Sequence, residues 1–92
     1  MKITRDLTVV NKEGLHARPA MQLVECAGQY DCDVTITRVD ADETTVADAK
    51  SVLQVITLQA TEGTTMQLDC DGDDAEAAAE AIAALFSSGF GE

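Results

Sequence analysis

The sequence predicts an α+β fold in which three helices cover one face of a four-stranded, mostly antiparallel sheet. Three segments alternate apolar and polar residues, which is the period of a strand with one buried face, and a short run at 44–46 predicts a fourth strand. Three other segments repeat apolar residues at the spacing of an amphipathic helix. The order of the segments is β-α-β-β-α-β-α, and the Thr, Asp and Gln residues at alternate strand positions suit a solvated second face.

A polar turn separates the first predicted strand from the first predicted helix. Residues 2–10 alternate apolar residues with Thr and Asp, which predicts the strand. Residues 11–14 are polar and end in Gly, which predicts the turn. Pro19 is tolerated in a helix only within its first turn, so we expect the helix to begin beside His16 and to end near Gly28.

The middle of the chain predicts two strands joined by an acidic loop, followed by a short helix. The β-branched run at 33–39 predicts the second strand, residues 40–43 the loop, and residues 44–46 a short third strand. Ser51 opens a helix of about two turns, whose apolar stripe is formed by Val52, Val55 and Ile56.

The last third of the chain predicts a strand and the longest helix. Residues 65–70 alternate strictly and form the fourth strand, which Asp71-Gly72 closes. Asp73 and Glu76 have the spacing of a capping box, and Gly89 ends the helix. One apolar stripe runs along it, made of Ala75, Ala78, Ala79, Ile82, Leu85 and Phe86.

Length and charge exclude several classes of protein. The 92 residues suit one domain, which we expect to span residues 1–92. Seventeen acidic residues against six basic ones give a formal net charge of −11, which argues against nucleic acid and anionic lipid as partners. The chain lacks a long apolar stretch and the apolar segment of a signal peptide, so we expect a cytoplasmic protein with no membrane insertion.

The cysteines do not point to a metal or redox site. Cys26, Cys32 and Cys70 are an odd number without a C-x-x-C pair, so we expect small buried or half-buried residues with reduced thiols. A zinc site could use these thiols together with His16, but their spacing matches no zinc finger. We therefore predict no metal and no cofactor.

The single histidine has the best position for chemistry. A neutral imidazole nitrogen is a competent nucleophile near neutral pH. His16 lies at the predicted start of a helix, where the backbone N–H groups of Ala17 and Arg18 would cradle an anion. The Arg18 guanidinium would add a charged partner for a phosphoryl group. The alternative interpretation is that His16 only caps the helix and Arg18 is a surface charge.

The run Gly14-Leu15-His16-Ala17-Arg18-Pro19-Ala20 resembles the phosphorylation-site signature of HPr, the histidine-containing phosphocarrier of the phosphoenolpyruvate-dependent sugar phosphotransferase system. Residues 50–58 resemble the regulatory-serine segment of that family. The resemblance implies an open-faced β-sandwich in which His16 is phosphorylated on Nδ1 with Arg18 as phosphate partner. It also implies that Ser51 matches the serine that an HPr kinase modifies in some bacteria.

Basic and apolar residues near the two candidate sites form a candidate docking surface. Lys12 and Lys50 lie next to the two candidate sites and predict a locally basic face on an acidic protein. By the same fold Leu53 is expected to be exposed near His16, where an apolar contact through Leu15 or Leu53 would suit a docking patch. The alternative is that Leu53 is an ordinary surface leucine. The chain departs from the family pattern through a longer acidic segment at 40–49 and through Gln54, where the family pattern has Gly.

The resulting prediction is a phosphocarrier that is not itself an enzyme. It would accept phosphate from enzyme I on His16 and pass it to an enzyme II A-type domain or another acceptor, as a monomer. One alternative is a regulatory module controlled by phosphorylation of Ser51 by HPr kinase/phosphorylase. Another is a nitrogen-branch phosphocarrier without sugar transport.

Overall fold

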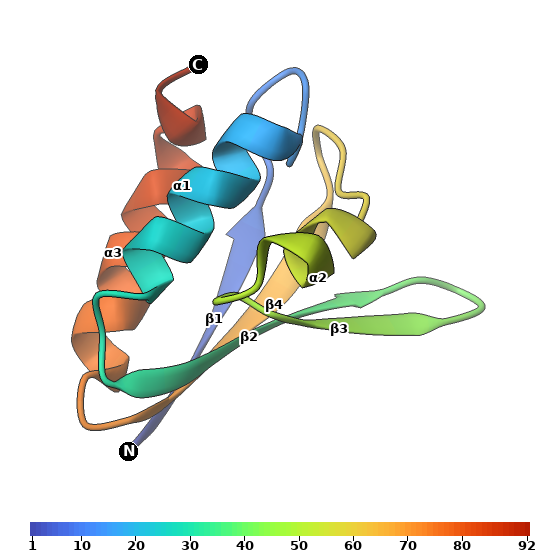
Figure 1. The fold of residues 1–92 in the computed structure, drawn as a ribbon. Helices are drawn as coiled ribbons and strands as arrows, with labels where there is room; N and C mark the ends of the chain where they lie inside the picture. Colours follow the sequence, from blue (N-terminus) through green and yellow to red (C-terminus); the bar gives the residue numbers. More distant parts are fainter.

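A single antiparallel sheet forms one layer of the molecule in the computed structural model, which describes residues 1–92 (Figure 1). Its strands are β1 (Lys2–Thr8), β2 (Cys32–Val39), β3 (Thr44–Asp48) and β4 (Thr65–Gly72). Their spatial order is β1-β4-β2-β3, and every neighbouring pair is antiparallel. The sheet is therefore fully antiparallel, with β1 and β3 at its edges.

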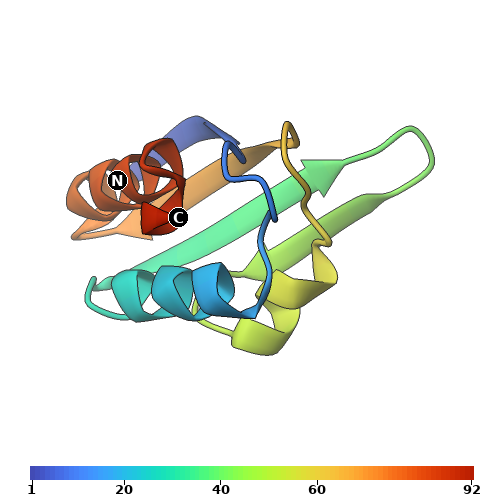
Figure 2. The same cartoon turned by 90° about the horizontal axis from the view of Figure 1, so that it is seen from above.

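Three helices lie on one face of this sheet, as predicted, and leave the other face uncovered (Figures 1 and 2). They are α1 (Ala17–Ala27), α2 (Val52–Thr57) and α3 (Ala75–Ser87), and a short 3-10 turn, η1 (Gly89–Gly91), follows α3. Helix α1 packs against both α2 and α3. The β-α-β-β-α-β-α order and the open-faced architecture are confirmed.

The core lies between the sheet and the helices, and it is built of aliphatic residues. Leu7 of β1 pairs with Met66 of β4, and Ile36 of β2 pairs with Leu68 of β4. All four side chains are buried. The stripe of α3 covers them with small residues that allow close approach to the sheet: Ala75, Ala78 and Ala79 are fully buried.

Several predicted boundaries are wrong by a few residues. Strand β1 ends at Thr8 rather than at residue 10, because the backbone of Val9 bonds instead to the turn at Gly63 and Thr64. Strand β3 continues to Asp48 and β4 to Gly72. Alternation locates a strand but not the point at which the ladder of hydrogen bonds ends.

The predicted stripe of α2 is wrong at one position. Val55 is buried and Val52 is partly buried, but Ile56 is 42% exposed. The helix has only six residues, and the next buried side chain is that of Leu58, just after it. A helix this short buries one apolar residue rather than a face.

The predicted capping box of α3 is also wrong. The N-cap is Asp74 rather than Asp73, and it makes no side-chain hydrogen bond to the helix. The Asp74 carboxylate instead accepts a hydrogen bond of 2.6 Å from the backbone N–H of Asp31. It thereby ties the start of α3 to the loop that precedes β2.

Candidate functional site

The turn before α1 is fixed by a backbone that only glycine fits well. Gly14 has φ of +73°, and a Cβ atom there would lie 2.4 Å from the carbonyl oxygen of Ala60. That same carbonyl accepts a hydrogen bond of 2.9 Å from the N–H of Leu15. The segment after α2 therefore braces the turn and sets where α1 begins.

His16 is the N-cap residue of α1, as predicted. Its carbonyl accepts the first helical hydrogen bond, from Ala20 N–H at 3.0 Å, while its side chain makes no capping bond. Pro19 has no N–H, so the N–H groups of Ala17 and Arg18 are the ones left without a carbonyl partner at the helix start. The free donors on which the prediction depended are thus present.

The imidazole is held by one of its two ring nitrogens. Nε2 of His16 lies 2.8 Å from Oε2 of Glu92 and 3.8 Å from Oε2 of Glu13. An ionised carboxylate can only accept, so Nε2 carries the proton and donates it to Glu92. In the neutral ring, Nδ1 then has the free lone pair. The His16 side chain as a whole is 37% exposed.

Beside His16 is an open cavity of about 400 Å³ with charged walls. It is lined by Lys12, Glu13, Arg18 and Glu92. Lys12 and Arg18 thus share one hollow next to the imidazole, although Lys12 precedes the helix and Arg18 lies within it. Two cations and two carboxylates thus face this hollow, and Lys12 and Arg18 are the side chains there that can pair with a phosphoryl group.

Glu92 was not predicted, and neither was its partner Asn11. The Asn11 Nδ2 group donates to Oε1 of Glu92 at 3.1 Å and to the carbonyl of Gly14 at 2.7 Å. Glu92 is 76 residues from His16 in the sequence. No local pattern could join them, because the contact depends on how the chain returns after α3.

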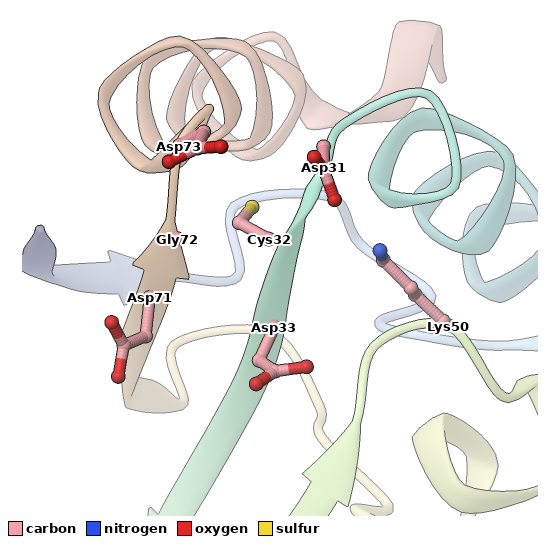
Figure 3. A pocket seen from close by; sticks show the side chains of 7 residues that line it. All are labelled: Asp31, Cys32, Asp33, Lys50, Asp71, Gly72 and Asp73. Atoms are coloured by element: carbon pink, nitrogen blue, oxygen red, sulfur yellow. The ribbon is translucent and has the colours of Figure 1, made fainter.

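Lys50 does not share a face with His16. Its Nζ donates to the carbonyl of Tyr30 at 2.9 Å, just beyond the far end of α1. Figure 3 shows it pointing into a separate cavity of about 330 Å³, which is also lined by Asp31, Cys32, Asp33, Asp71, Gly72 and Asp73. The prediction of one basic face that includes Lys50 is wrong, because the ammonium group lies among these acids instead.

The two leucines expected in a docking patch have opposite environments. Leu15 is 6% exposed and belongs to the core, because the turn at Gly14 directs it inward. Leu53 is 80% exposed on α2, as predicted. Met21 of α1 and Ile56 of α2 are exposed as well, and the two helices pack together. We call Met21, Leu53 and Ile56 the apolar patch.

Ser51 caps α2, and its hydroxyl is weakly engaged. Its Oγ accepts a hydrogen bond of 3.3 Å from the N–H of Gln54. The Gln54 side chain accepts one of 2.9 Å from the N–H of Asp48. Gln54 therefore closes the turn between β3 and α2, which is a structural role for the residue that departs from the family pattern.

The cysteines are core residues, as predicted. Cys32 and Cys70 are buried and Cys26 is half-buried, all as free thiols. Burial raises the pKa of the Cys70 thiol to about 11 and also raises the pKa of the other two. Protonated thiols are poor nucleophiles and poor metal ligands.

None of the helices has the length and apolar character needed to cross a bilayer.

The comparisons with known proteins agree on one family. Residues 3–88 match the family model for the PTS HPr component phosphorylation site. The phosphocarrier protein NPr of Escherichia coli K12 is 37% identical over 92 residues, with 100% of this chain and 99% of that protein covered. The phosphocarrier protein HPr of Haloferax volcanii is 42% identical over 84 residues, with 91% and 92% covered.

A solved structure extends the agreement to the fold. The crystal structure of HPr-C-His from Thermoanaerobacter tengcongensis superposes with a TM-score of 0.82 at 32% identity, covering 100% of this chain and 97% of that one. Proteins of this family interact with enzyme I and with downstream phosphotransferase proteins, and they carry a phosphoryl group rather than catalyse its transfer. The chain belongs to the HPr family of phosphocarrier proteins.

Proposed function

We propose that His16 carries the phosphoryl group on Nδ1, receiving it from enzyme I, with phosphoenolpyruvate as the original source. The observation that supports this assignment is the hydrogen bond from Nε2 to Glu92, which leaves Nδ1 as the nitrogen with a free lone pair. This lone pair attacks phosphorus, the bond between phosphorus and the donor breaks, and its electron pair leaves with the donor. In the second transfer, a nucleophile of the acceptor attacks phosphorus, the bond between phosphorus and Nδ1 breaks, and its electron pair returns to Nδ1.

Arg18 and Lys12 are the charged partners of the phosphoryl group in this proposal. Both line the hollow beside His16, and Arg18 can also donate its backbone N–H together with that of Ala17. These donors are in place before the phosphoryl group arrives, so little reorganisation is needed as negative charge moves towards His16. In this proposal the charged partners stabilise the phosphoryl group on His16 until it is transferred to an acceptor.

We assign partner docking to the apolar patch on α1 and α2. Met21, Leu53 and Ile56 are exposed on packed helices, where one surface can serve enzyme I and an enzyme II A-type domain or another acceptor in turn. Leu15 contributes only by setting the backbone of the turn. The proposed working state is a single-domain monomer in the cytoplasm.

A regulatory role for Ser51 is the second candidate function. Its hydroxyl accepts only one long hydrogen bond, and the residue is partly exposed, so a kinase such as HPr kinase/phosphorylase could reach it. Relatives of similar identity carry the names NPr and HPr, so acceptors of the nitrogen branch and of the sugar branch are both candidates.

Incubation of the purified chain with phosphoenolpyruvate and enzyme I tests the carrier proposal. The expected product carries an acid-labile, alkali-stable phosphate that forms only when enzyme I is present. The Ser51→Ala variant should be labelled to the same extent as wild type, because the acid-labile phosphate is on His16. A phosphoserine would instead be acid-stable. Absence of label on the wild-type protein would contradict the proposal.

A further inference from the structure

We propose that Glu92 is a positioning residue for His16, whose side-chain carboxylate accepts the Nε2 hydrogen bond and presents Nδ1 as the reacting nitrogen. This inference rests on the proposed function of His16 and extends it to a residue at the other end of the chain. It assigns a role in phosphoryl transfer to a side chain that need not touch the phosphoryl group itself.

The contact between Glu92 and His16 has the geometry of a charge-assisted hydrogen bond. The separation of 2.8 Å is within the range expected for a ring N–H and a carboxylate. The Glu92 side chain is only 21% exposed. Glu13 offers a useful contrast, since its carboxylate lies 3.8 Å from the same nitrogen and its side chain is 77% exposed. Only Glu92 is close enough to orient the ring.

The backbone that carries Glu92 is anchored in the core. Phe90 is 3% exposed and packs edge-on against Phe86, with ring centroids 4.8 Å apart. Phe90 also has φ of +58°, a left-handed conformation that a non-glycine residue keeps only when its surroundings hold it. The η1 turn therefore has one fixed direction, and it lies at the same end of the molecule as the start of α1 (Figure 1).

The carboxylate is also held from its second oxygen. Asn11 is 4% exposed, and its Nδ2 donates both to Oε1 of Glu92 and to the carbonyl of Gly14. One oxygen of Glu92 thus accepts from Asn11 and the other accepts from His16. The carboxylate is tied to the turn that precedes His16, so the ring and its acceptor are placed by the same segment of backbone.

This arrangement has two consequences for transfer. The His16 side chain makes no capping bond, so without Glu92 the ring would be free to rotate about its side-chain torsions and would lose part of its alignment. As Nδ1 gives its electron pair to phosphorus, positive charge develops on the ring, and a carboxylate at Nε2 stabilises that charge. Both effects act on the rate rather than on the fold.

The test uses the fact that the chain contains one histidine, so its imidazole gives one set of nuclear magnetic resonance signals. The Nε2 proton should be visible in wild type, because its hydrogen bond slows exchange with water. It should disappear in Glu92→Ala and remain in Glu13→Ala, the matched control that removes a carboxylate at the same nitrogen but beyond hydrogen-bond distance. Circular dichroism should match wild type for both variants, since Phe90 and the core are unchanged.

Labelling rates with enzyme I complete the test. Glu92→Ala should be phosphorylated about tenfold more slowly than wild type, which is the low end of the loss found when the acceptor that orients a metal-bound histidine is removed. Glu92→Gln keeps an acceptor for Nε2 but not the charge, so its rate should fall between those of wild type and Glu92→Ala. Glu43→Ala removes an exposed carboxylate from the loop between β2 and β3, outside the site, and should stay within about twofold of wild type.

The outcomes separate this inference from the proposed function. A wild-type rate in Glu92→Ala, or an Nε2 proton signal that survives in that variant, would overturn the positioning role while leaving His16 as the carrier. If wild type itself takes no label from enzyme I, the carrier proposal fails, and the positioning role in transfer fails with it.

Discussion

At the scale of single residues, Gly14 fixes the turn before His16, although it has no side chain that could contact the phosphoryl group. Its positive φ and the close carbonyl of Ala60 leave no room for a side chain. Gly14→Ala should therefore lower the free energy of unfolding by more than the roughly 1–2 kcal/mol that a left-handed alanine costs. It should also slow labelling of His16. Urea denaturation measures the first effect and enzyme I assays the second.

Gly63 provides the control for that prediction. It also has a positive φ, of +89°, but a Cβ atom there would meet nothing within 4 Å. Gly63→Ala should pay only the conformational cost of about 1–2 kcal/mol and keep the wild-type labelling rate. Equal losses of stability in the two variants would mean that the contact with Ala60 is unimportant.

Arg18 acts by charge next to His16, so its removal should slow transfer without abolishing it. Arg18→Ala keeps the backbone donors of the helix start, and we expect labelling to slow by up to about a hundredfold. Arg5→Ala removes the same charge from an exposed position on β1 and should leave the rate unchanged. An Arg18→Ala rate equal to that of Arg5→Ala would remove Arg18 from the site.

At the scale of elements, the start of α3 distinguishes two neighbouring aspartates. Asp74→Ala removes the carboxylate that accepts the Asp31 N–H, and should cost about 1 kcal/mol of stability. Asp73→Ala changes an exposed residue and should stay within about 0.5 kcal/mol of wild type. Thermal unfolding of both variants measures the difference, and the reverse order would restore the capping box predicted from sequence.

Helix α2 separates a capping serine from a regulatory one. Ser51→Ala loses the bond to Gln54 and should cost about 1 kcal/mol, whereas Ser51→Asp keeps a capping acceptor and should match wild type in thermal stability. If Ser51 also lies on the docking surface, the new charge in Ser51→Asp should slow labelling by enzyme I. Equal labelling rates for Ser51→Asp and wild type would leave Ser51 as a cap only.

The elements themselves were largely predictable because their signals are local. Alternation marks β1, β2 and β4, and the position of Pro19 places the start of α1 within a residue of its observed bound at Ala17. The errors occur where a contact between distant segments decides the outcome. Asp74 turns to Asp31 instead of capping its own helix. The backbone hydrogen bond from Leu15 to Ala60 fixes the turn that directs the Leu15 side chain into the core.

At the scale of the whole molecule, the chain order places the site at one end of the sheet. Strand β4 lies between β1 and β2, so the loops that leave β1, α2 and α3 come together where α1 begins. His16, Ala17 and Arg18 could be predicted because they are consecutive. Glu92 and the distance of Lys50 from His16 could not, because each depends on a loop and a remote partner.

The net charge of the whole chain does not describe the charge at each cavity. The net charge of −11 describes the whole chain, but two of its six basic residues, Lys12 and Arg18, line the hollow at His16. Lys50 instead lies among acids in the second cavity (Figure 3). Glu13 and Glu92 line the same hollow, so Lys12 and Arg18 give it a mixed charge on a protein that is strongly acidic as a whole.

Parallel labelling of wild type and His16→Ala with phosphoenolpyruvate and enzyme I tests the central claim most directly. His16 is a half-exposed N-cap whose side chain makes no capping bond, so the variant should keep the circular dichroism spectrum of wild type. Wild type should acquire one acid-labile phosphate per chain, and His16→Ala should acquire none. An acid-labile label on folded His16→Ala would show that another group carries the phosphoryl and would contradict the account.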